Sequence, residues 1–338
     1  MIASIIILNY QGEKIISETI NSLLKLKFPR IDFEIIIVDN NSRDKSYQII
    51  TDYSQKYPQL IKTLFLSQNL GFGQGNNQGI KISQGKYIVL LNNDCLVDPN
   101  WLLALIKIAK SQPDIFSVTS KIKKYPTTLN QIQNAGSLIF QDGYGRDIGA
   151  IVTSDRKQLY EIDNNQYDET KEVYSSCGAA VLFRKSLLDK IGLFDNNFFM
   201  YYEDTELCER ALLSGYKNLY CPSAVVYHHH AASSKEWSDF FIYHTEKGRL
   251  LHLLYHFPLK IFFKEYFKFT FKAKLRLVKS LIKRKNITKS WQYLRVSLYY
   301  FCNFPKLINR RNFYSNLYSS KNLQINYQKI LSGYWYFN

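Results

Sequence analysis

Cysteine is scarce in this sequence and follows no pattern. The five cysteines are odd in number, scattered along 338 residues and free of any CxxC spacing. A disulfide framework needs paired cysteines at regular positions. The cysteine usage therefore argues against a disulfide framework and favours a protein of the reducing cytoplasm.

Long hydrophobic runs are also missing. No stretch of about 18 uncharged apolar residues occurs, which argues against a membrane-spanning helix. Residues 2–8 are apolar, but they have neither a basic leader nor a small-residue cleavage site, so we expect a first β-strand and not a signal peptide. The sequence has no GxGxxG fingerprint and no Walker lysine, so phosphoryl transfer on a P-loop is not expected.

Acidic residues are nearly absent from the last third of the chain. Residues 1–240 carry 25 Lys and Arg against 26 Asp and Glu, whereas residues 241–338 carry 19 against 2. The whole excess of positive charge, +16 for the chain, therefore lies in the second part. We expect two regions: a nearly neutral domain, 1–240, and a basic helical region, 241–338, that binds a polyanion.

The basic region interleaves lysines with aromatic residues, as in 262–268. A basic amphipathic helix with an aromatic face suits the surface of an anionic bilayer. The alternative is a helical subdomain that packs its aromatic residues inward and exposes its lysines. Nucleic acid is not an expected partner, because no nucleic-acid-binding motif accompanies the charge.

Strand and helix signals alternate over the first 120 residues. Apolar strands are expected at 2–8, 33–38, 61–66 and 87–91, with helices at 13–26 and 43–57 and a short one ending near 83. This alternation predicts an α/β fold with a central, mostly parallel sheet. From 120 to 172 the pattern dissolves into polar sequence with weak strands, which predicts a long irregular connection such as a lid or acceptor loop. A strand at 173–183, a helix at 203–214 and two short strands near 219 and 225 follow.

Polar side chains end two of the expected strands. Asn92, Asn93 and Asp94 follow the strand at 87–91, and Asp39 ends the strand at 33–38. Ligands of open α/β sheets bind beyond the carboxyl ends of the strands. A carboxylate there can hold a divalent cation against an anionic ligand, or can accept hydrogen bonds from a ribose or a base. For Asp39, a plain turn residue is the alternative.

Two further groups stand out. Glu203 and Asp204 open a helix directly after four aromatic residues, and partial desolvation by those rings would raise a carboxylate pKa toward that of a general base. The alternative is that these carboxylates only complement the helix dipole. His228 ends a strand and could complete a metal shell with Asp94, or it could be structural. The glycine-rich segment 71–76 offers backbone amides to an anion, or simply makes turns.

In this order the segments resemble family 2 glycosyltransferases, most closely their bacterial rhamnosyltransferase-like branch. The matching segments are 5–10, 38–42, 69–77, 91–94, 177–180, 192–195, 202–210 and the stretch around His228. Each segment is modest alone, but eight in the family's order are highly specific, and they span about residues 2–235. The resemblance implies a GT-A fold and an enzyme that inverts the anomeric centre.

The resemblance also implies roles for single residues. Asp204 would be the catalytic base, with Glu203 supporting the acceptor or the base, and Asp94 and His228 would hold Mn²⁺ or Mg²⁺. The residues implied for nucleotide and donor binding are Asn9, Asp39, Asn69, Asn76, Asn92 and Asn93. Asn92 and Asn93 stand in the family's DxD motif, whose first aspartate is asparagine in this sequence.

The implied function is transfer of a hexosyl or deoxyhexosyl group from a nucleotide-diphosphate sugar to a glycan or polyprenyl-linked acceptor. We expect a peripheral protein on the inner face of a bacterial cell membrane, acting in surface polysaccharide synthesis. One alternative is a sugar-phosphate nucleotidyltransferase, but its glycine-rich basic signature is poorly matched at 9–14. The other is a non-catalytic protein that binds a nucleotide sugar or a polyanion, against which Asp94, Asp204 and His228 argue.

Overall fold

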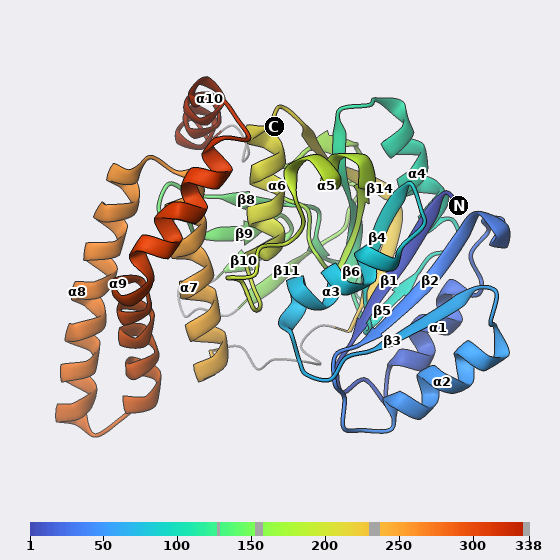
Figure 1. Ribbon diagram of the computed structural model, residues 1–338, viewed down its shortest axis with the longest axis horizontal. Coiled ribbons are helices and arrows are strands. Elements are labelled where there is room, and N and C mark those ends of the chain that lie inside the picture. The colour runs from blue at the N-terminus through green and yellow to red at the C-terminus, as the bar shows by residue number, and fades with distance from the viewer. Residues whose placement is uncertain (127–128, 153–157, 230–236, 334–338) are drawn as a thin grey trace.

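A parallel sheet forms the centre of the molecule (Figure 1). The structure is a computed structural model, and it describes residues 1–126, 129–152, 158–229 and 237–333. Four strands run parallel in the order β3 (Ile61–Phe65), β2 (Phe33–Asp39), β1 (Ala3–Asn9) and β4 (Tyr87–Asn92). Their aliphatic residues are buried on both faces, as in other sheets covered by helices. The α/β fold with a mostly parallel sheet is thus confirmed.

Antiparallel strands extend the sheet beyond β4. β13 (Ala180–Arg184) pairs antiparallel with β4 and with β6 (Ile115–Lys124), and β14 (Lys217–His228) runs parallel to β6. The short β5 (Cys95–Val97) lies antiparallel to the end of β14. This pairing brings the end of β14 next to the chain that leaves β4.

The segment expected to be an irregular connection with weak strands contains six short strands among its described residues. The structure forms β7 (Gln131–Asn134), β10 (Ala150–Val152), β11 (Gln158–Ile162), a hairpin of β8 (Ser137–Ile139) and β9 (Gly145–Asp147), and β12 (Lys171–Glu172). The parts of this segment at 127–128 and 153–157 lie outside the described residues. The strands are short and partly polar, which explains why a hydrophobic pattern does not find them.

Helices cover both faces of the sheet. On one face α1 (Ile16–Leu23), α2 (Ser46–Lys56) and α4 (Trp101–Ser111) pack into one core cluster, and a short 3₁₀ turn, η1 (Arg30–Asp32), precedes β2. On the other face lie α3 (Gly71–Ile82), α5 (Lys185–Ile191) and α6 (Glu203–Leu213). Two-sided coverage leaves the carboxyl ends of the parallel strands as the open edge.

Three local predictions differ from the structure. The glycine-rich segment is the start of α3 and not a loop, because Gly75 and Gly79 let the helix approach Leu8 and Ile6 so closely that a Cβ would clash. The strand expected at 173–183 begins only at Ala180. The two short strands near 219 and 225 are a single bulged strand, β14.

The region after residue 237 is helical, as expected. It forms α7 (Asp239–His256), α8 (Leu259–Lys283), α9 (Ile287–Ser315) and α10 (Ser320–Leu331). These helices share a hydrophobic core with Leu138, Tyr174 and Phe198 of the preceding region. Among the described residues no helix combines the length and apolar character needed to span a bilayer.

Buried charges attach the C-terminal helices to α6. His256 Nε2 lies 2.9 Å from Glu206 Oε1, and His252 Nε2 lies 2.8 Å from Glu209 Oε2. The Arg210 guanidinium pairs with Glu206 at 2.6 Å and lies over the Tyr314 ring of α9. Removing the partners of buried charges is strongly destabilising. The division at residue 240, which stays our proposal, therefore separates regions that share a core.

Candidate functional site

Asp94 and His228 meet where β4 and β14 end. Asp94 Oδ1 lies 3.0 Å from His228 Nε2, and both side chains are buried. The antiparallel pairing of β5 with β14 sets His228 opposite Cys95 and thereby beside Asp94. His229 points elsewhere, toward Glu18 at 3.6 Å, and His230 lies outside the described residues. The pair foreseen from the sequence thus lies together.

A contact to the other ring nitrogen of His228 orients its imidazole. Gln133 Oε1, on β7, lies 3.1 Å from His228 Nδ1. When Nδ1–H donates to this amide oxygen, the lone pair of Nε2 faces Asp94. Metal-ligating histidines are commonly fixed through the second ring nitrogen in this way. Gln133 lies in the segment expected to be irregular, and no sequence signal identified it.

The side chains present fit a hard divalent cation. Asp94 Oδ1 is fully buried and, within the described ranges, accepts no well-aligned hydrogen bond despite the nearby imidazole. Burial raises the pKa of Asp94, but the His228 imidazole outweighs it and leaves the pKa below its ordinary value. A carboxylate and an imidazole suit Mn²⁺ and also Mg²⁺.

Cys95 is the third potential ligand atom of this cluster, within 4.8 Å of the other two. Burial, followed by the charge of Asp94, raises the pKa of its thiol well above the ordinary value. A protonated thiol is a poor ligand, and hard cations prefer oxygen donors. The ligands that the cluster offers to such a cation are therefore Asp94 and His228.

Asp204 is held at the start of α6 by backbone and side-chain donors. Gly178 N donates to Asp204 Oδ2 at 2.9 Å, and Thr205 N donates to Oδ1 at 2.7 Å. Burial raises the pKa of Asp204, and these hydrogen bonds lower it by less. A fixed carboxylate with a raised pKa is suited to accept a proton.

Glu203 differs from its neighbour. Its side chain is buried, and its Oε2 has no hydrogen-bond partner among the described residues. Burial, and then the charge of Asp204, raises the pKa of Glu203 well above its ordinary value. Burial thus favours the neutral form of Glu203, whereas the hydrogen bonds to Asp204 favour the charged form of its neighbour.

Asp147 is a site residue that the sequence did not reveal. It lies on β9, where Ser137 Oγ donates to its Oδ1 at 2.8 Å. Burial and the charge of Asp204 raise the pKa of Asp147 to about 6, whereas His228 acts in the opposite direction. Asp147 is therefore within electrostatic reach of both Asp204 and His228. A lone aspartate in a weakly patterned segment gave no signal.

The nucleotide-binding candidates form two hydrogen-bonded groups at the same edge. Asn9 Nδ2 donates to Asp39 Oδ1 at 2.8 Å, and Asn93 Nδ2 donates to Asn9 Oδ1 at 2.9 Å. In the second group Asn40 Nδ2 donates to Asn69 Oδ1 at 2.9 Å. The ends of β1, β2 and β4 are thereby joined into one polar rim.

Two candidates lie differently. Asn76 is buried within α3, where its amide donates to Phe72 O at 3.0 Å. Asn92 is the last residue of β4, and its backbone N–H donates to Ala179 O at 2.9 Å. Asn76 thus braces the helix that covers the rim, whereas Asn92 directly precedes Asn93 and Asp94.

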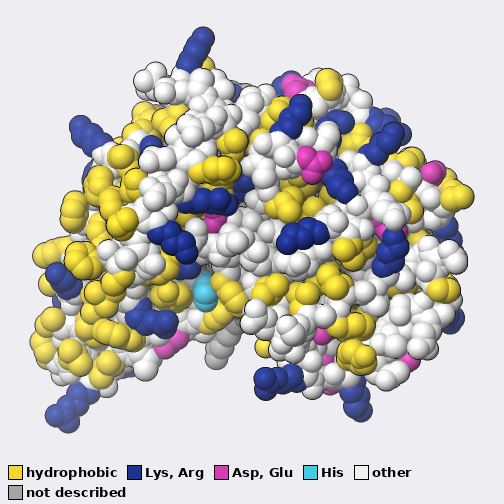
Figure 2. Space-filling view, viewed as in Figure 1, with side chains coloured by type: hydrophobic (Ala, Val, Ile, Leu, Met, Phe, Trp, Pro, Cys, Tyr) yellow, Lys and Arg dark blue, Asp and Glu magenta, His cyan; other side chains and the backbone are white. Residues whose placement is uncertain are grey.

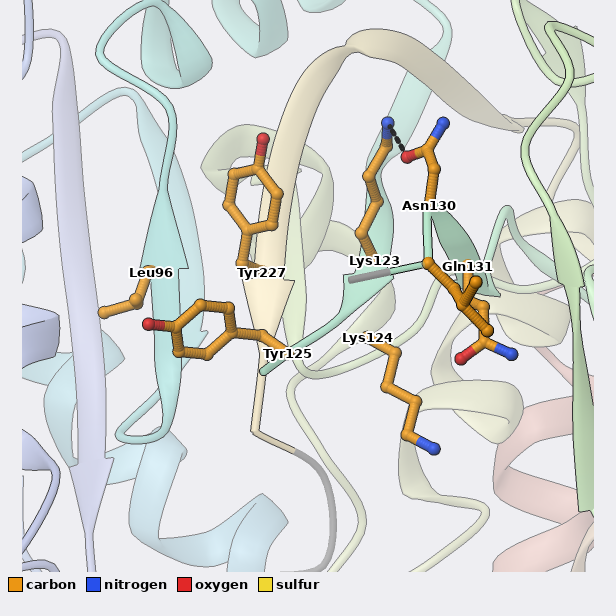
Figure 3. Close-up of a pocket in the computed structure, with 8 residues that line it drawn as sticks. Leu96, Lys123, Lys124, Tyr125, Asn130, Gln131 and Tyr227 are labelled. Carbon is orange, nitrogen blue, oxygen red and sulfur yellow. Dashed lines mark hydrogen bonds between the residues drawn. The ribbon is translucent and has the colours of Figure 1, made fainter. Parts of the chain in front are cut away.

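A pocket of about 390 Å³ lies near the ends of β5, β6 and β14 (Figure 3). Tyr227 and Leu96 line it, and they neighbour His228 and Cys95 in sequence. Side chains alternate between the faces of a strand, so this pocket lies on the opposite face of β5 and β14 from the Asp94–His228 pair. Lys123 in its wall is engaged by Asn130 Oδ1 at 2.8 Å (Figure 3).

The backbone before Asp204 is strained. Tyr201 and Tyr202 both have left-handed conformations, with φ of 69° and 70°, which non-glycine residues adopt at a cost. Gly248 of α7 lets them approach, since a Cβ there would lie 2.8 Å from Tyr201 O and 3.0 Å from Tyr202 Cβ. The C-terminal region thus sets the entry into α6.

If Asp204 acts as a general base, Gly248→Ala should lower kcat by up to about 100-fold, because a displacement near 1 Å of a catalytic group can have that effect. The added methyl would push the Tyr201–Tyr202 backbone and with it Asp204. Steady-state kinetics and thermal unfolding would be measured together. Gly145→Ala is the control, since a Cβ there meets nothing closer than 3.6 Å. Equal kinetics for the two variants would contradict the role of Gly248 in positioning Asp204.

Comparison with known proteins gives one family match. The sequence profile described as Glycosyl transferase family 2 matches residues 4–192. The chain is 35% identical over 113 residues to a poly(ribitol-phosphate) beta-glucosyltransferase of Bacillus spizizenii, a match that covers 33% of this chain and 18% of that protein. It is 25% identical over 216 residues to a poly-beta-1,6-N-acetyl-D-glucosamine synthase of Staphylococcus epidermidis, covering 64% and 47%.

A solved structure shares the fold. It is a crystal structure of GalNAc-T7 with UDP, GalNAc and Mn²⁺, which superimposes with a TM-score of 0.63 at 16% identity and covers 81% of this chain and 51% of that one. At this identity the likeness establishes the fold alone. The chain spans less than half the length of the two curated relatives named above.

Proposed function

The chain belongs to glycosyl transferase family 2, and from this premise we propose that it is an inverting sugar transferase of the rhamnosyltransferase-like branch. It moves a hexosyl or deoxyhexosyl group from a nucleotide-diphosphate donor to a hydroxyl of a glycan or polyprenyl-linked saccharide. The observation that carries the proposal is the buried Asp94–His228 contact of 3.0 Å. The charges of Asp204 and His228 both act on the pKa of Asp147, which supports placing Asp204 in the same site.

In the proposed reaction Asp204 accepts the proton of the acceptor hydroxyl while the oxygen attacks the anomeric carbon from the face opposite the nucleotide. The N–H groups of Gly178 and Thr205 hold the carboxylate in place. Burial and the charge of Asp204 favour the neutral form of Glu203, which would add no second negative charge. Fixed orientation and a raised pKa are what an effective general base requires.

The donor diphosphate is bound at the Asp94–His228 end of the site. Bound there, Mn²⁺ or Mg²⁺ supplies Lewis-acid stabilisation of the negative charge on the leaving group. Asp39, braced by Asn9, and Asn69, braced by Asn40, contact the ribose or base. Asn93 and Asn92 continue this rim toward the sugar, and Asn76 supports it from α3.

The names of the relatives support a polymer acceptor. One describes glucosyl transfer to poly(ribitol phosphate), and the other describes synthesis of a poly-N-acetylglucosamine. We propose that this chain acts likewise in bacterial surface polysaccharide synthesis. It would work in the cytoplasm, peripherally on the inner face of the cell membrane, with the basic region 241–338 contacting anionic lipid.

The test is a nucleotide-sugar screen with Mn²⁺ or Mg²⁺ that measures both thermal stabilisation and release of nucleoside diphosphate. A bound donor raises the melting temperature by mass action. Turnover with release of nucleoside diphosphate supports the proposal. Stabilisation without release would instead indicate a non-catalytic binding protein, and formation of a nucleotide sugar from a sugar phosphate would indicate a nucleotidyltransferase.

We also expect Asp147→Asn to lower kcat/KM by about 10- to 100-fold, the loss typical of a hydrogen bond to a charged group. Asp147 is placed to orient a sugar hydroxyl between Asp204 and the Asp94–His228 pair. Asp142→Asn, in the same hairpin turn, is the control. An unchanged kcat/KM in Asp147→Asn would mean that Asp147 only supports the fold.

A further inference from the structure

Helix α8 has two apolar faces, of which the protein core covers only one. Its inner face buries Phe262, Phe269 and Ala273 in the core that it shares with α7 and α9. The residues of the opposite face are exposed, with Phe267 at 63%, Phe271 at 65% and Ile282 at 77%. This outer stripe consists of Phe263, Phe267, Phe271, Leu275, Val278 and Ile282.

The spacing of the stripe is regular. Its members follow one another at intervals of three or four residues, so they lie on one side of the helix over its whole length. An amphipathic helix that only covers a core would place polar residues there. The outer face of α8 is therefore built as a second apolar surface.

Helix α9 continues this surface. Ile287, Trp291, Leu298 and Phe301 recur at helical spacing and are exposed, Phe301 at 79%. They lie opposite the residues of α9, such as Val296 and Tyr300, that pack in the core. Figure 2 shows hydrophobic side chains gathered over the part of the molecule where α8 and α9 lie. Exposed apolar patches of this extent mark sites of interaction.

Positive charge borders the stripe. Lysines follow its members directly in sequence at 264, 268, 272, 279 and 283. Residues 259–315 contain 15 Lys and Arg and one acidic residue, Glu265, whose carboxylate lies 3.5 Å from Lys268. An apolar stripe with a lysine border matches the interface of an anionic bilayer, where acyl chains meet negative head groups.

We infer that the outer faces of α8 and α9 form a bilayer-docking surface that inserts its aromatic and aliphatic stripe into an anionic leaflet. A second copy of the chain fits less well, because two surfaces of the same sign would face each other. The inference narrows the membrane association in the proposed function to one surface. Lipid binding itself requires no sugar transfer.

The docking surface is held in a fixed relation to the active site. Helix α7 joins it to α6 through the His252–Glu209 and His256–Glu206 pairs. These pairs hold the docking surface and the start of α6 in one arrangement, so a bound bilayer would have a fixed orientation relative to Asp204.

The experiment is vesicle co-flotation of the full chain without donor sugar. Truncation near residue 240 is unsuitable, because it would remove His256, which contacts Glu206, and His252, which contacts Glu209. We expect binding to phosphatidylcholine vesicles that contain phosphatidylglycerol, and little binding to phosphatidylcholine alone. Phe267→Ser/Phe271→Ser/Ile282→Ser should reduce the bound fraction by about 10-fold or more, because the apolar contact with the acyl region is lost. Lys272→Glu/Lys279→Glu should reduce it as well and make it less salt-sensitive.

The matched control is Ile31→Ser/Leu103→Ser. It removes two apolar side chains that lie outside α8 and α9 and are 85% and 50% exposed. It should bind like the unaltered chain, and thermal unfolding should confirm that all variants fold. Equal flotation of the stripe variant and the unaltered chain, or none by either, would overturn the inference. The inference would also be overturned if sedimentation velocity showed a dimer of the unaltered chain and a monomer of the stripe variant, and flotation were the same for both. Donor hydrolysis is measured separately, so a failure of transfer with intact flotation would count only against the proposed function.

Discussion

Asp204→Asn is expected to abolish sugar transfer while the affinity for the donor stays nearly unchanged. The variant keeps the shape of the side chain and can still accept the hydrogen bond from Thr205 N, but it cannot take up a proton. Loss of a general base lowers the rate by about 10²- to 10⁴-fold. Single-turnover transfer and donor titration by thermal shift would measure the two quantities separately.

Glu203→Gln is the matched control for this prediction. Because burial and the charge of Asp204 favour the neutral form of Glu203, an amide of the same size should change the rate little. The pH–rate profile offers a second check. Since the pKa of Asp204 is raised, activity should increase with pH through a range above that of an ordinary aspartate. Near-normal turnover of Asp204→Asn would exclude Asp204 as the general base. So would a loss of rate in Glu203→Gln as large as the loss in Asp204→Asn.

Removal of divalent cations is expected to stop transfer, and Mn²⁺ or Mg²⁺ should restore it. Asp94 and His228 bring an oxygen and a nitrogen to 3.0 Å within a buried site, an arrangement that a cation would stabilise. His228→Gln should therefore raise the metal concentration needed for half-maximal activity. Gln133→Leu should do so by about 10- to 100-fold, the loss typical of an outer-shell partner.

His229→Gln is the control here, since the side chain of His229 lies against Glu18, 3.6 Å from its carboxylate. It should respond to metal like the unaltered chain. Binding of Mn²⁺ can also be followed without turnover, by the paramagnetic relaxation of water protons. Full activity in excess EDTA, or identical metal dependence of the His228 and His229 variants, would exclude the proposed role of the pair.

The local spacing of apolar residues was enough to predict the strands and helices that have a strong periodicity. The aliphatic runs ending at Asn9, Asp39 and Asn92 indicated strands that are covered on both faces. The alternation of these strands with helices indicated that they run parallel. Since carboxyl ends of parallel strands meet at one edge, the polar residues that follow them had to lie near one another. The same reasoning failed for β7 to β9, which are too short and too polar to carry a period, and so Gln133 and Asp147 went unnoticed.

The sequence by itself thus determined the parallel core of the sheet, its ligand edge and the basic helical character of the end of the chain. These follow from the spacing of apolar residues and from charge, both of which are local properties. Only the tertiary structure decided that His228 contacts Asp94, that Asp147 lies within reach of Asp204, and that α8 leaves one of its two apolar faces uncovered. Those facts depend on which distant segments pack together, and the pairing of β5 with β14 and the buried charges between α6 and α7 fix that packing.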